Sequence, residues 1–412
     1  MKTSKFGQTT DYKNELKKIC DIAKKLRGLR GKTELNWREP AEWAVKYSHM
    51  NGTPALALTI TLNPTGCSWA KNGGCTMCGE YAGSVKSGIP DYIHIAQFAS
   101  AIAEFSQKYS PSWLRINQEG NYANAGETEN FAQTTILKLA TQIKGIQRVT
   151  IESRPGFLTE NSLKEYSEIF SGSGVELEIG MGFEAADDVV RNVCVNKGET
   201  IDDFKHALQL MEKFDILSLA YVLLKPPFLT EKEAIDESIN SIRTATEIGF
   251  KRISLEPMSI HKYTVVDALA RLNLYQVPWL WSVIDVAKQC KDIPELGIGG
   301  IGYYPRPFHL SRNHCDCNPR CDAQIWETLK DFGKNRNFSV FDDLDFKCKP
   351  KWEDACKLTA TPLKQRIQEQ IAKIDVAHYQ RVVDDEPESE PPQSSILIKG
   401  GAQISYVSKG SK

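Results

Sequence analysis

The chain has 412 residues, a formal net charge of −1 and a charged fraction of 25%. This length is enough for one large domain and a smaller one, because compact domains usually contain about 50 to 250 residues. The near-zero net charge gives no whole-molecule field that would attract nucleic acid. No stretch reaches the roughly 18 apolar residues of a membrane span, so we expect a soluble protein without membrane partners and a cytoplasmic location.

The N-terminal segment, residues 1–45, is a basic extension that predicts an amphipathic helix over residues 11–31. Apolar side chains such as Ile19 recur on one face of this helix, and lysines such as Lys24 recur on the other. The basic face is either an ordinary solvated surface or a contact for RNA, and the sequence leaves both readings open.

Residues 46–300 alternate strand-like runs with helical patterns. The strand-like runs are 55–62, 112–117, 147–152, 175–181, 216–224 and 251–256. The helical patterns between them are 93–109, 127–143, 158–170, 185–194 with 201–214, and 231–248. Parallel strands need crossover connections, so this α/β pattern predicts a parallel sheet covered by helices. Whether such a sheet stays open or curls into a barrel, ligands collect at the carboxyl ends of its strands.

The sequence changes character after residue 300. Residues 301–382 contain a Pro-rich and Cys-rich stretch and then a charged helical pattern at 362–378, which predicts a small Cys-rich second domain. Residues 383–412 include EPESEPPQSS and few apolar residues, a composition typical of a disordered tail.

The 11 cysteines gather in two tight groups, which favours metal chemistry over a disulfide framework. The first group lies in NPTGCSWAKNGGCTMCGEYAG, where Cys75 follows Cys67 by eight positions and Cys78 follows Cys75 by three. Three thiolates on a glycine-rich loop can hold a [4Fe-4S] cluster and leave one iron open for an exogenous chelate. A structural zinc loop or three reduced thiols are the alternatives, but a reactive cofactor suits the mouth of a βα sheet better.

The second group lies in RNHCDCNPRC. It contains His314, Cys315, Cys317 and Cys321, and Cys348 and Cys356 follow farther along the chain. Four such ligands suffice for a closed tetrahedral zinc site that would stabilise a small domain. A second iron-sulfur cluster and free thiols are also compatible with this spacing.

Three cysteines after the first strand of a six-unit βα pattern resemble the radical S-adenosylmethionine (SAM) superfamily. In that superfamily the amino and carboxylate groups of SAM chelate the open iron. The wide first spacing is similar to the branch that contains the elongator catalytic subunit and the radical SAM subunit of archaeosine synthase. The archaeosine-type segments are IESRPGFLT, LEIGMGFE, NKGET, YVLLKPPFLTEKEA, YQVPWLWSV and HCDC. This resemblance implies a partial (β/α)6 barrel of radical SAM type.

Polar residues at the strand ends are candidate SAM contacts. Gly120 would let the backbone approach the amino group of the methionine part, and Glu119 could accept hydrogen bonds from that group or from the ribose. By resemblance, Glu152 and Arg154 contact SAM at the end of the third predicted strand. A plain turn and a surface ion pair are the structural alternatives.

Three further residues follow the next strands. Glu184 lies beside glycines whose exposed backbone suits a ligand, and by resemblance Lys197 of NKGET meets the SAM carboxylate. Lys225 precedes two prolines, so a rigid turn would present its charge near substrate or SAM. Trp279 and Trp281 form either a stacking platform for a base or, as we favour, part of the core.

The resemblance also implies an activity. An archaeosine-type enzyme would act as a lyase on a modified 7-deazaguanine in tRNA, breaking the C–N bond of a lysine adduct to leave a formamidine. It would need an electron donor and a partner transferase subunit. The alternatives are a radical SAM enzyme with another nucleic acid or a small molecule as substrate, and a zinc-stabilised nucleic-acid-binding protein that contains no iron.

Overall fold

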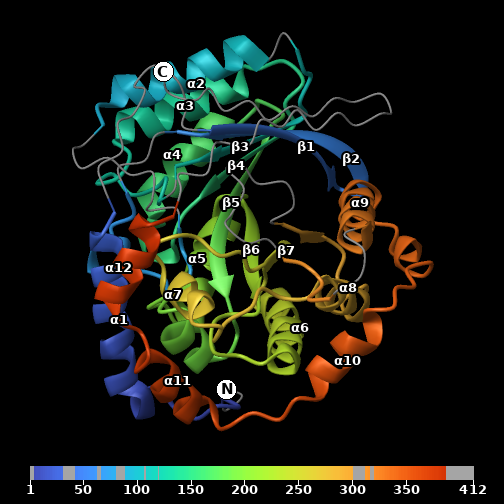
Figure 1. Ribbon diagram of the computed structural model, residues 1–412. Helices are drawn as coiled ribbons and strands as arrows, with labels where there is room; N and C mark the ends of the chain where they lie inside the picture. Colours follow the sequence, from blue (N-terminus) through green and yellow to red (C-terminus); the bar gives the residue numbers. More distant parts are fainter. Residues whose placement is uncertain are drawn as a thin grey trace.

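The computed structural model describes residues 4–30, 42–62, 66–79, 89–105, 108–118, 120–299, 311–315 and 320–386. Its centre is an eight-stranded sheet whose strands lie in chain order from β1 to β8 (Figure 1). The first pair is antiparallel, and all later pairs are parallel. The strands are β1 (Glu42–Met50), β2 (Thr53–Thr61), β3 (Trp113–Asn117), β4 (Arg148–Glu152), β5 (Glu176–Glu184), β6 (Leu217–Leu224), β7 (Arg252–Pro257) and β8 (Leu296–Ile298).

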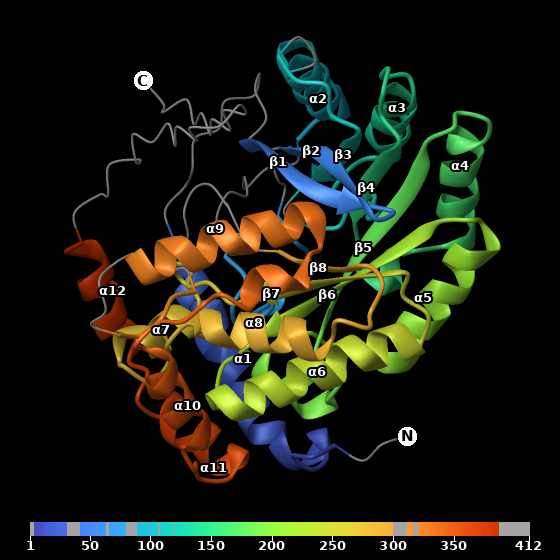
Figure 2. The same cartoon turned by 90° about the vertical axis from the view of Figure 1, so that its right-hand side faces the viewer.

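The crossover helices cover the outer face of this curved sheet, as the two views together show (Figures 1 and 2). They are α2 (Asp91–Phe105), α3 (Asn130–Thr141), α4 (Glu160–Phe170), α5 (Ile201–Lys213), α6 (Glu231–Glu247) and α8 (Leu280–Gln289). Thr159, Thr200 and Thr230 precede α4, α5 and α6, and each accepts a hydrogen bond from the third helical amide. The third helical side chain bonds back in each case, so these reciprocal caps fix where three consecutive helices begin.

The parallel strands are buried on both faces, which explains their long apolar runs. In β4, for example, all residues except the last are buried. Helices cover the outer face, and the inner face encloses a barrel interior that also contains charged side chains. The predicted α/β partial barrel is confirmed.

A buried ion triad occupies the interior near the amino ends of β4, β5 and β7. Glu178 is fully buried and accepts hydrogen bonds from Arg252 at 3.0 Å and from the Thr150 hydroxyl at 2.9 Å. Arg148 Nη1 lies 3.5 Å from the Glu178 carboxylate. Burial alone would raise the pKa of Glu178, but Arg252 and Arg148 lower it overall. Three charged groups therefore satisfy one another in a region that water does not reach.

The barrel does not close by strand pairing, and α9 (Arg320–Asn335) lies across the gap between β1 and β8 (Figure 2). His49 on β1 helps to link the two edges. Its Nδ1 lies 3.3 Å from the carbonyl oxygen of Gly333 on α9, and its Nε2 lies 3.7 Å from the Glu295 carboxylate beside β8. Burial lowers the pKa of His49 to about 4, so the ring is neutral at physiological pH.

A second apolar core joins the two ends of the chain. α1 (Lys13–Gly28) packs against α7 (Val265–Arg271), α11 (Leu363–Ile371) and α12 (Val376–Asp384). Ile19, Leu26 and Ile367 are among its buried members. The helix predicted over residues 11–31 is present, and its apolar face meets C-terminal helices. α10 (Lys349–Lys357) packs near α6 instead.

Other details of the elements differ from the sequence prediction. β1 and β8 were not predicted, the pattern at 185–194 contains a π-helical turn (Val190–Cys194), and the pattern at 362–378 forms two helices. Trp279 and Trp281 are buried, so the core interpretation holds for both. Cys321 and Cys348 belong to the same apolar cluster as the barrel strands. The division into domains stays a prediction, and the predicted tail beyond residue 386 lies outside the described residues.

None of the helices in the described part of the chain combines the length and the apolar character that a membrane crossing requires.

The ion triad generates a stability prediction. Glu178→Gln should destabilise the fold by about 1–3 kcal/mol, because it removes the fully buried charge that Arg252 and Arg148 share, while Arg148 keeps its pair with Glu176 at 2.7 Å. Urea denaturation at pH 7 measures the change. Since the native pKa of Glu178 is lowered, its contribution is present above the unfolded value of about 4.3 and is lost as the pH falls through the native value. An exposed control, Glu168→Gln on α4, should change stability by less than about 0.5 kcal/mol, and an equal loss in both variants would contradict the assignment.

Candidate cofactor site

The cysteine loop, residues 66–79, follows β2 at the carboxyl end of the parallel sheet. Cys67, Cys75 and Cys78 are each partly buried. Within the described residues, their three sulfur atoms do not form a group within 4.8 Å of one another. Ligands of a single zinc ion must lie closer together than this, whereas the cysteines of a cubane each bind a different iron. The three sulfur atoms as placed therefore do not match the ligands of a single tetrahedral zinc ion.

Helix α1 packs against this loop and donates hydrogen bonds to its backbone. Arg27 Nη2 donates hydrogen bonds to the carbonyl oxygens of Cys75 at 2.6 Å and Cys78 at 3.1 Å. Gly74 has a φ of +62°, and a Cβ there would lie 2.7 Å from the Cα of Ala70. Only glycine therefore fits this turn of the loop. The basic N-terminal helix contributes at least one cation inward, to the cofactor site, which the sequence did not predict.

A second set of bonds ties the loop to the segment after β5. The Thr76 amide donates to the Val195 carbonyl at 2.9 Å, and the Thr76 hydroxyl donates to the Cys194 carbonyl at 2.7 Å. Asn196 Nδ2 donates to the Gly74 carbonyl at 2.8 Å. The loop is thus held on two sides by buried polar groups.

Glu127 ties the loop to the segment that follows β3. Its carboxylate accepts hydrogen bonds from the backbone amides of Ser68 at 2.8 Å and Asn121 at 2.6 Å, and its side chain is buried. A Cβ at Gly120 would lie 2.4 Å from this carboxylate, so Gly120 is required for the close approach. Asn121 Nδ2 also lies 3.7 Å from the sulfur of Cys67. The role of Glu127 has no recognisable motif in the sequence.

Three of the predicted SAM contacts meet beside the loop. Lys197 Nζ pairs with Glu184 at 3.0 Å, and Arg154 Nη2 donates to the Lys197 carbonyl at 2.6 Å. Glu199, which the sequence did not single out, pairs with Arg154 Nε at 2.9 Å. Burial would lower the pKa of Lys197, but Glu184 and Glu199 raise it overall, so this lysine remains charged. We call Arg154, Glu184, Lys197 and Glu199 the ion cluster.

The ion cluster acts electrostatically on Cys75. Burial raises the pKa of the Cys75 thiol, while the positive charges of Lys197 and Arg154 oppose that shift. The guanidinium of Arg154 lies over the Trp69 ring at 4.7 Å, and Trp69 belongs to the cysteine loop. Cations therefore line the side of the loop where thiolates and an anionic ligand group would need them.

Glu152 lies elsewhere, in the barrel interior. The Tyr221 hydroxyl donates to Glu152 Oε1 at 2.6 Å and accepts a hydrogen bond from Arg115 Nη2 at 3.2 Å. Burial raises the pKa of nearby Glu256, and burial together with Arg115 lowers the pKa of Lys46 to about 8. We call Lys46, Arg115, Glu152, Tyr221 and Glu256 the interior polar layer. Of these residues the sequence analysis named only Glu152. A single polar residue within an otherwise apolar strand gives no sequence signal that it faces a functional site.

Lys225 belongs to a different contact network. Its Nζ pairs with Glu231 on α6 at 2.6 Å, and its carbonyl accepts a hydrogen bond from the Tyr275 hydroxyl at 2.8 Å. Its φ of +67° fits the tight turn expected before the prolines. The proposed role of Lys225 in binding stays a prediction. Glu119 lies outside the described residues.

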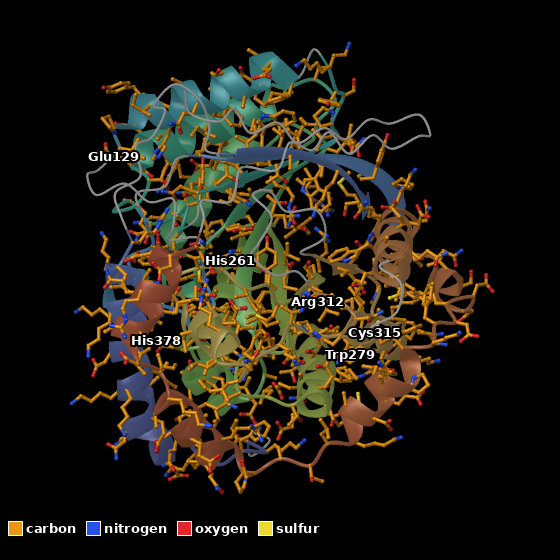
Figure 3. All side chains as sticks on the ribbon, viewed as in Figure 1. Glu129, His261, Trp279, Arg312, Cys315 and His378 are labelled. Carbon is orange, nitrogen blue, oxygen red and sulfur yellow. The ribbon has the colours of Figure 1, made fainter. Side chains whose placement is uncertain are left out.

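A partly buried histidine, His261, adjoins the end of the cysteine loop. A Cβ at Gly79 would lie 2.2 Å from the Cβ of His261, and His261 Nε2 lies 2.9 Å from the Ser259 hydroxyl. Burial lowers the pKa of His261 to about 4, so its ring is neutral. Figure 3 shows this residue toward the centre of the molecule, at the carboxyl end of β7. The sequence analysis missed His261.

The second cysteine group differs from its predicted composition. Cys315, Cys321 and Cys348 bring their sulfur atoms within 4.8 Å of one another. His314 does not join them: its Nε2 lies 2.7 Å from the carbonyl oxygen of Val277. Cys317 lies outside the described residues.

Known proteins place the chain in a family. It is 30% identical over 323 residues to archaeosine synthase subunit beta of Methanosarcina acetivorans, which covers 78% of this chain and 90% of that protein. The subunit of the same name from Thermococcus kodakarensis is 27% identical over 73% of this chain and 92% of its own length. An uncharacterized protein of Methanocaldococcus jannaschii is 30% identical over 83% and 92%, respectively. No family model matches.

Similarities to solved structures are distant. The archaeal Elp3 of Methanocaldococcus infernus has a TM-score of 0.42 and 12% identity, and the alignment covers 58% of this chain and 59% of that one. Methylornithine synthase also has a TM-score of 0.42 and 12% identity, and that alignment covers 71% of this chain and 74% of the synthase. The assignment therefore rests on the sequence relatives.

The parallel barrel with a three-cysteine loop at its carboxyl end defines an α/β protein built around a cofactor site. The chain belongs to the archaeosine synthase subunit beta family, because a relative at 30% identity is covered over nine-tenths of its length. The resemblance to the archaeosine-type branch, predicted from sequence segments, is confirmed.

The hydrogen bonds of Glu127 generate a prediction about the cysteine loop. Glu127→Gln should reduce the iron retained after anaerobic reconstitution, because an amide NH2 would face backbone amides and leave buried donors unsatisfied at about 1–3 kcal/mol. Iron analysis and absorbance near 400 nm measure the loss. The matched control is Glu129→Gln, an exposed residue labelled in Figure 3, which should retain wild-type iron. Equal iron in both variants would remove Glu127 from the support of the loop.

Proposed function

We propose that this chain is a radical SAM enzyme in which Cys67, Cys75 and Cys78 hold a [4Fe-4S] cluster. The observation that carries the proposal is a three-cysteine loop fixed at the carboxyl end of the parallel sheet, beside a buried cluster of charges. When bound, such a cluster and SAM supply a 5′-deoxyadenosyl radical that removes a hydrogen atom from the substrate.

The ion cluster suits the binding of SAM. Lys197 and Arg154 are cations beside Cys75, and Glu184 and Glu199 hold them in place by ion pairs of 3.0 and 2.9 Å. The carboxylate of SAM would join these cations, and the backbone at Gly120, close to Cys67, would contact its amino group. Because the cations are already positioned by the fold, binding needs little reorganisation of these side chains.

The family membership supports a substrate. We propose a modified 7-deazaguanine in tRNA that carries a lysine adduct, and a lyase reaction that breaks its C–N bond to leave a formamidine. The reaction would take place in the cytoplasm with an electron donor and a partner subunit that supplies the transferase step. Two relatives are named as the beta subunit of a synthase, which supports the expectation of a partner.

The interior polar layer suits the lysine part of this substrate. An amino acid carries a carboxylate and an ammonium group, and the layer offers cations in Lys46 and Arg115 and carboxylates in Glu152 and Glu256. These groups lie on strands of the barrel, so their positions are set by the sheet. Burial strengthens each polar contact and excludes water from the reacting carbon.

Formation of 5′-deoxyadenosine tests the chemistry. The protein, reconstituted anaerobically with iron and sulfide, should release 5′-deoxyadenosine from SAM when dithionite is added, and Cys75→Ala should abolish this product. Cys356→Ala, on α10 and distant in sequence from the loop, serves as the control and should retain it. A colourless protein that binds zinc but no iron would instead favour a zinc-stabilised nucleic-acid-binding protein. An intact, reduced cluster that leaves SAM uncleaved would contradict the proposal.

Tyr221→Phe tests the substrate assignment. The change removes the hydroxyl that joins Arg115 to Glu152, so we expect product formation on modified tRNA to fall by about 10- to 100-fold, the effect of losing hydrogen bonds to charged groups. Mass spectrometry of digested tRNA, with the partner subunit present, measures the product. Reductive cleavage of SAM without tRNA should persist, because the ion cluster is unchanged. The exposed Tyr92→Phe is the control, and equal activity in both variants would exclude the interior polar layer from substrate binding.

A further inference from the structure

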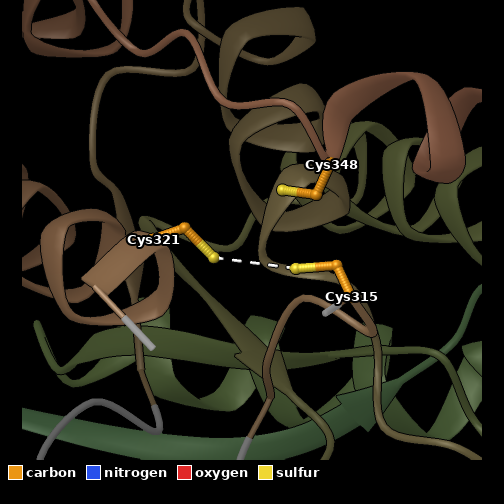
Figure 4. Close-up of side chains that lie close together, drawn as sticks. All are labelled: Cys315, Cys321 and Cys348. Atoms are coloured by element: carbon orange, nitrogen blue, oxygen red, sulfur yellow. Dashed lines mark hydrogen bonds between the residues drawn. The ribbon is translucent and has the colours of Figure 1, made fainter. Parts of the chain in front are cut away.

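Three cysteines that lie far from the cysteine loop in sequence come together in the structure. Cys315, Cys321 and Cys348 have sulfur atoms within 4.8 Å of one another, and the Cys315 and Cys321 sulfurs are 3.8 Å apart (Figure 4). Cys321 and Cys348 are buried, and Cys315 is partly buried. Such a group of thiols needs a physical explanation, because Cys348 joins the other two from 27 residues farther along the chain.

The spacing of the sulfur atoms matches the geometry of one tetrahedral ion. Zinc–sulfur bonds are about 2.3 Å long, which places the sulfurs of a tetrahedral site about 3.8 Å apart. A disulfide would need a separation of about 2.05 Å. The cysteines of a cubane each bind a different iron and would therefore be spread more widely. The observed 3.8 Å thus fits a single thiophilic ion.

The surroundings supply the outer contacts that a metal site requires. The indole N–H of Trp281 donates toward the sulfur of Cys348 at 3.4 Å, and Asn313 Nδ2 lies 3.9 Å from the sulfur of Cys321. Donors of this kind stabilise thiolates and orient them toward a metal. Trp281 and Cys348 are both buried, so these contacts are shielded from water.

We propose that Cys315, Cys321 and Cys348 bind one structural zinc ion through three thiolates, with the fourth position of the tetrahedron taken by another donor. On binding, the three thiols release their protons, and no change of redox state is involved. His314 is not part of the site, because its ring contacts the Val277 carbonyl and lies edge-on to Trp279. The proposed set keeps Cys315 and Cys321 of the predicted group and adds Cys348, while Cys317 lies outside the described residues.

The position of the site indicates what the ion does. Cys321 lies in the first turn of α9, the helix across the gap between β1 and β8, and Cys348 precedes α10. Cys315 lies in the segment next to Ser311, whose hydroxyl bonds to the Met258 carbonyl after β7. One ion would thus fasten α9 and α10 to the barrel wall. This role is independent of the chemistry proposed at the cysteine loop.

Metal analysis of the full chain, purified anaerobically, tests the site. We expect about one zinc ion per chain, which is the content of a single tetrahedral site. This zinc should remain in the Cys67→Ala/Cys75→Ala/Cys78→Ala variant, which should contain no iron. It should be lost in Cys321→Ser/Cys348→Ser, whereas the control Cys356→Ser should keep it. The triple variant separates this proposal from that of the cysteine loop, because each predicts a different metal.

If the double variant does not fold, a second measurement on the wild-type chain still tests the proposal. X-ray absorption on the zinc of the wild-type chain should give three or more sulfur ligands at about 2.3 Å, and cobalt(II) substitution should give intense thiolate charge-transfer bands. Fewer than three sulfurs would overturn the proposal. So would zinc that persists in a folded double variant, a chain without zinc, or iron that remains in the triple variant, since the last result would indicate a second iron-sulfur cluster.

Discussion

The position of the three loop cysteines depends on how buried polar groups are satisfied around them. A loop that enters the protein brings backbone amides and carbonyls away from water, and each must find a partner. Here Glu127 accepts from the amides on one side, and Arg27 donates to the carbonyls on the other. Because these partners come from distant segments, the loop has a fixed shape only when the whole barrel has assembled around it.

Three groups of charged residues occupy the barrel interior and its carboxyl end. The ion triad around Glu178 closes the end where the parallel strands begin, and Glu152 and Glu256 of the interior polar layer lie farther along β4 and β7. The ion cluster and the cysteine loop lie at the opposite end. Each set contains both signs of charge, which is the condition under which charged groups are tolerated in a medium of low dielectric constant. Among the described strands, the unpaired edges of β1 and β8 are bridged by α9.

Local patterns in the sequence were sufficient for part of this architecture. Six strands and the helices between them follow from apolar runs and helical periodicity, because both are properties of residues near one another in the chain. The loop cysteines were visible as a motif for the same reason. The antiparallel strand β1 was missed because it carries polar residues such as Lys46 and His49 into the interior, and β8 was missed because only Leu296–Ile298 form it.

Contacts between distant segments could not be predicted in this way. Glu127 and Glu199 are ordinary acids until folding places their partners beside them. Cys348 joins Cys315 only because α9 and α10 fold back against the barrel, and no spacing rule connects these positions. Arg154 and Lys197 were named through resemblance and Glu184 from its position beside glycines at a strand end, and the structure adds the ion pairs that connect these residues. Glu152 was also named through resemblance but lies in the barrel interior.

The contact between α1 and the cysteine loop also affects when the loop reaches its final structure during synthesis. Arg27 is carried by α1, yet that helix packs against α11 and α12, which are made much later in synthesis, and Glu15 on α1 accepts a hydrogen bond of 2.5 Å from Gln368 on α11. While the chain is still being translated, the loop therefore lacks its final support. If the loop holds the proposed cluster, delivery of iron and sulfide to a fully supported site would follow the synthesis of these two helices.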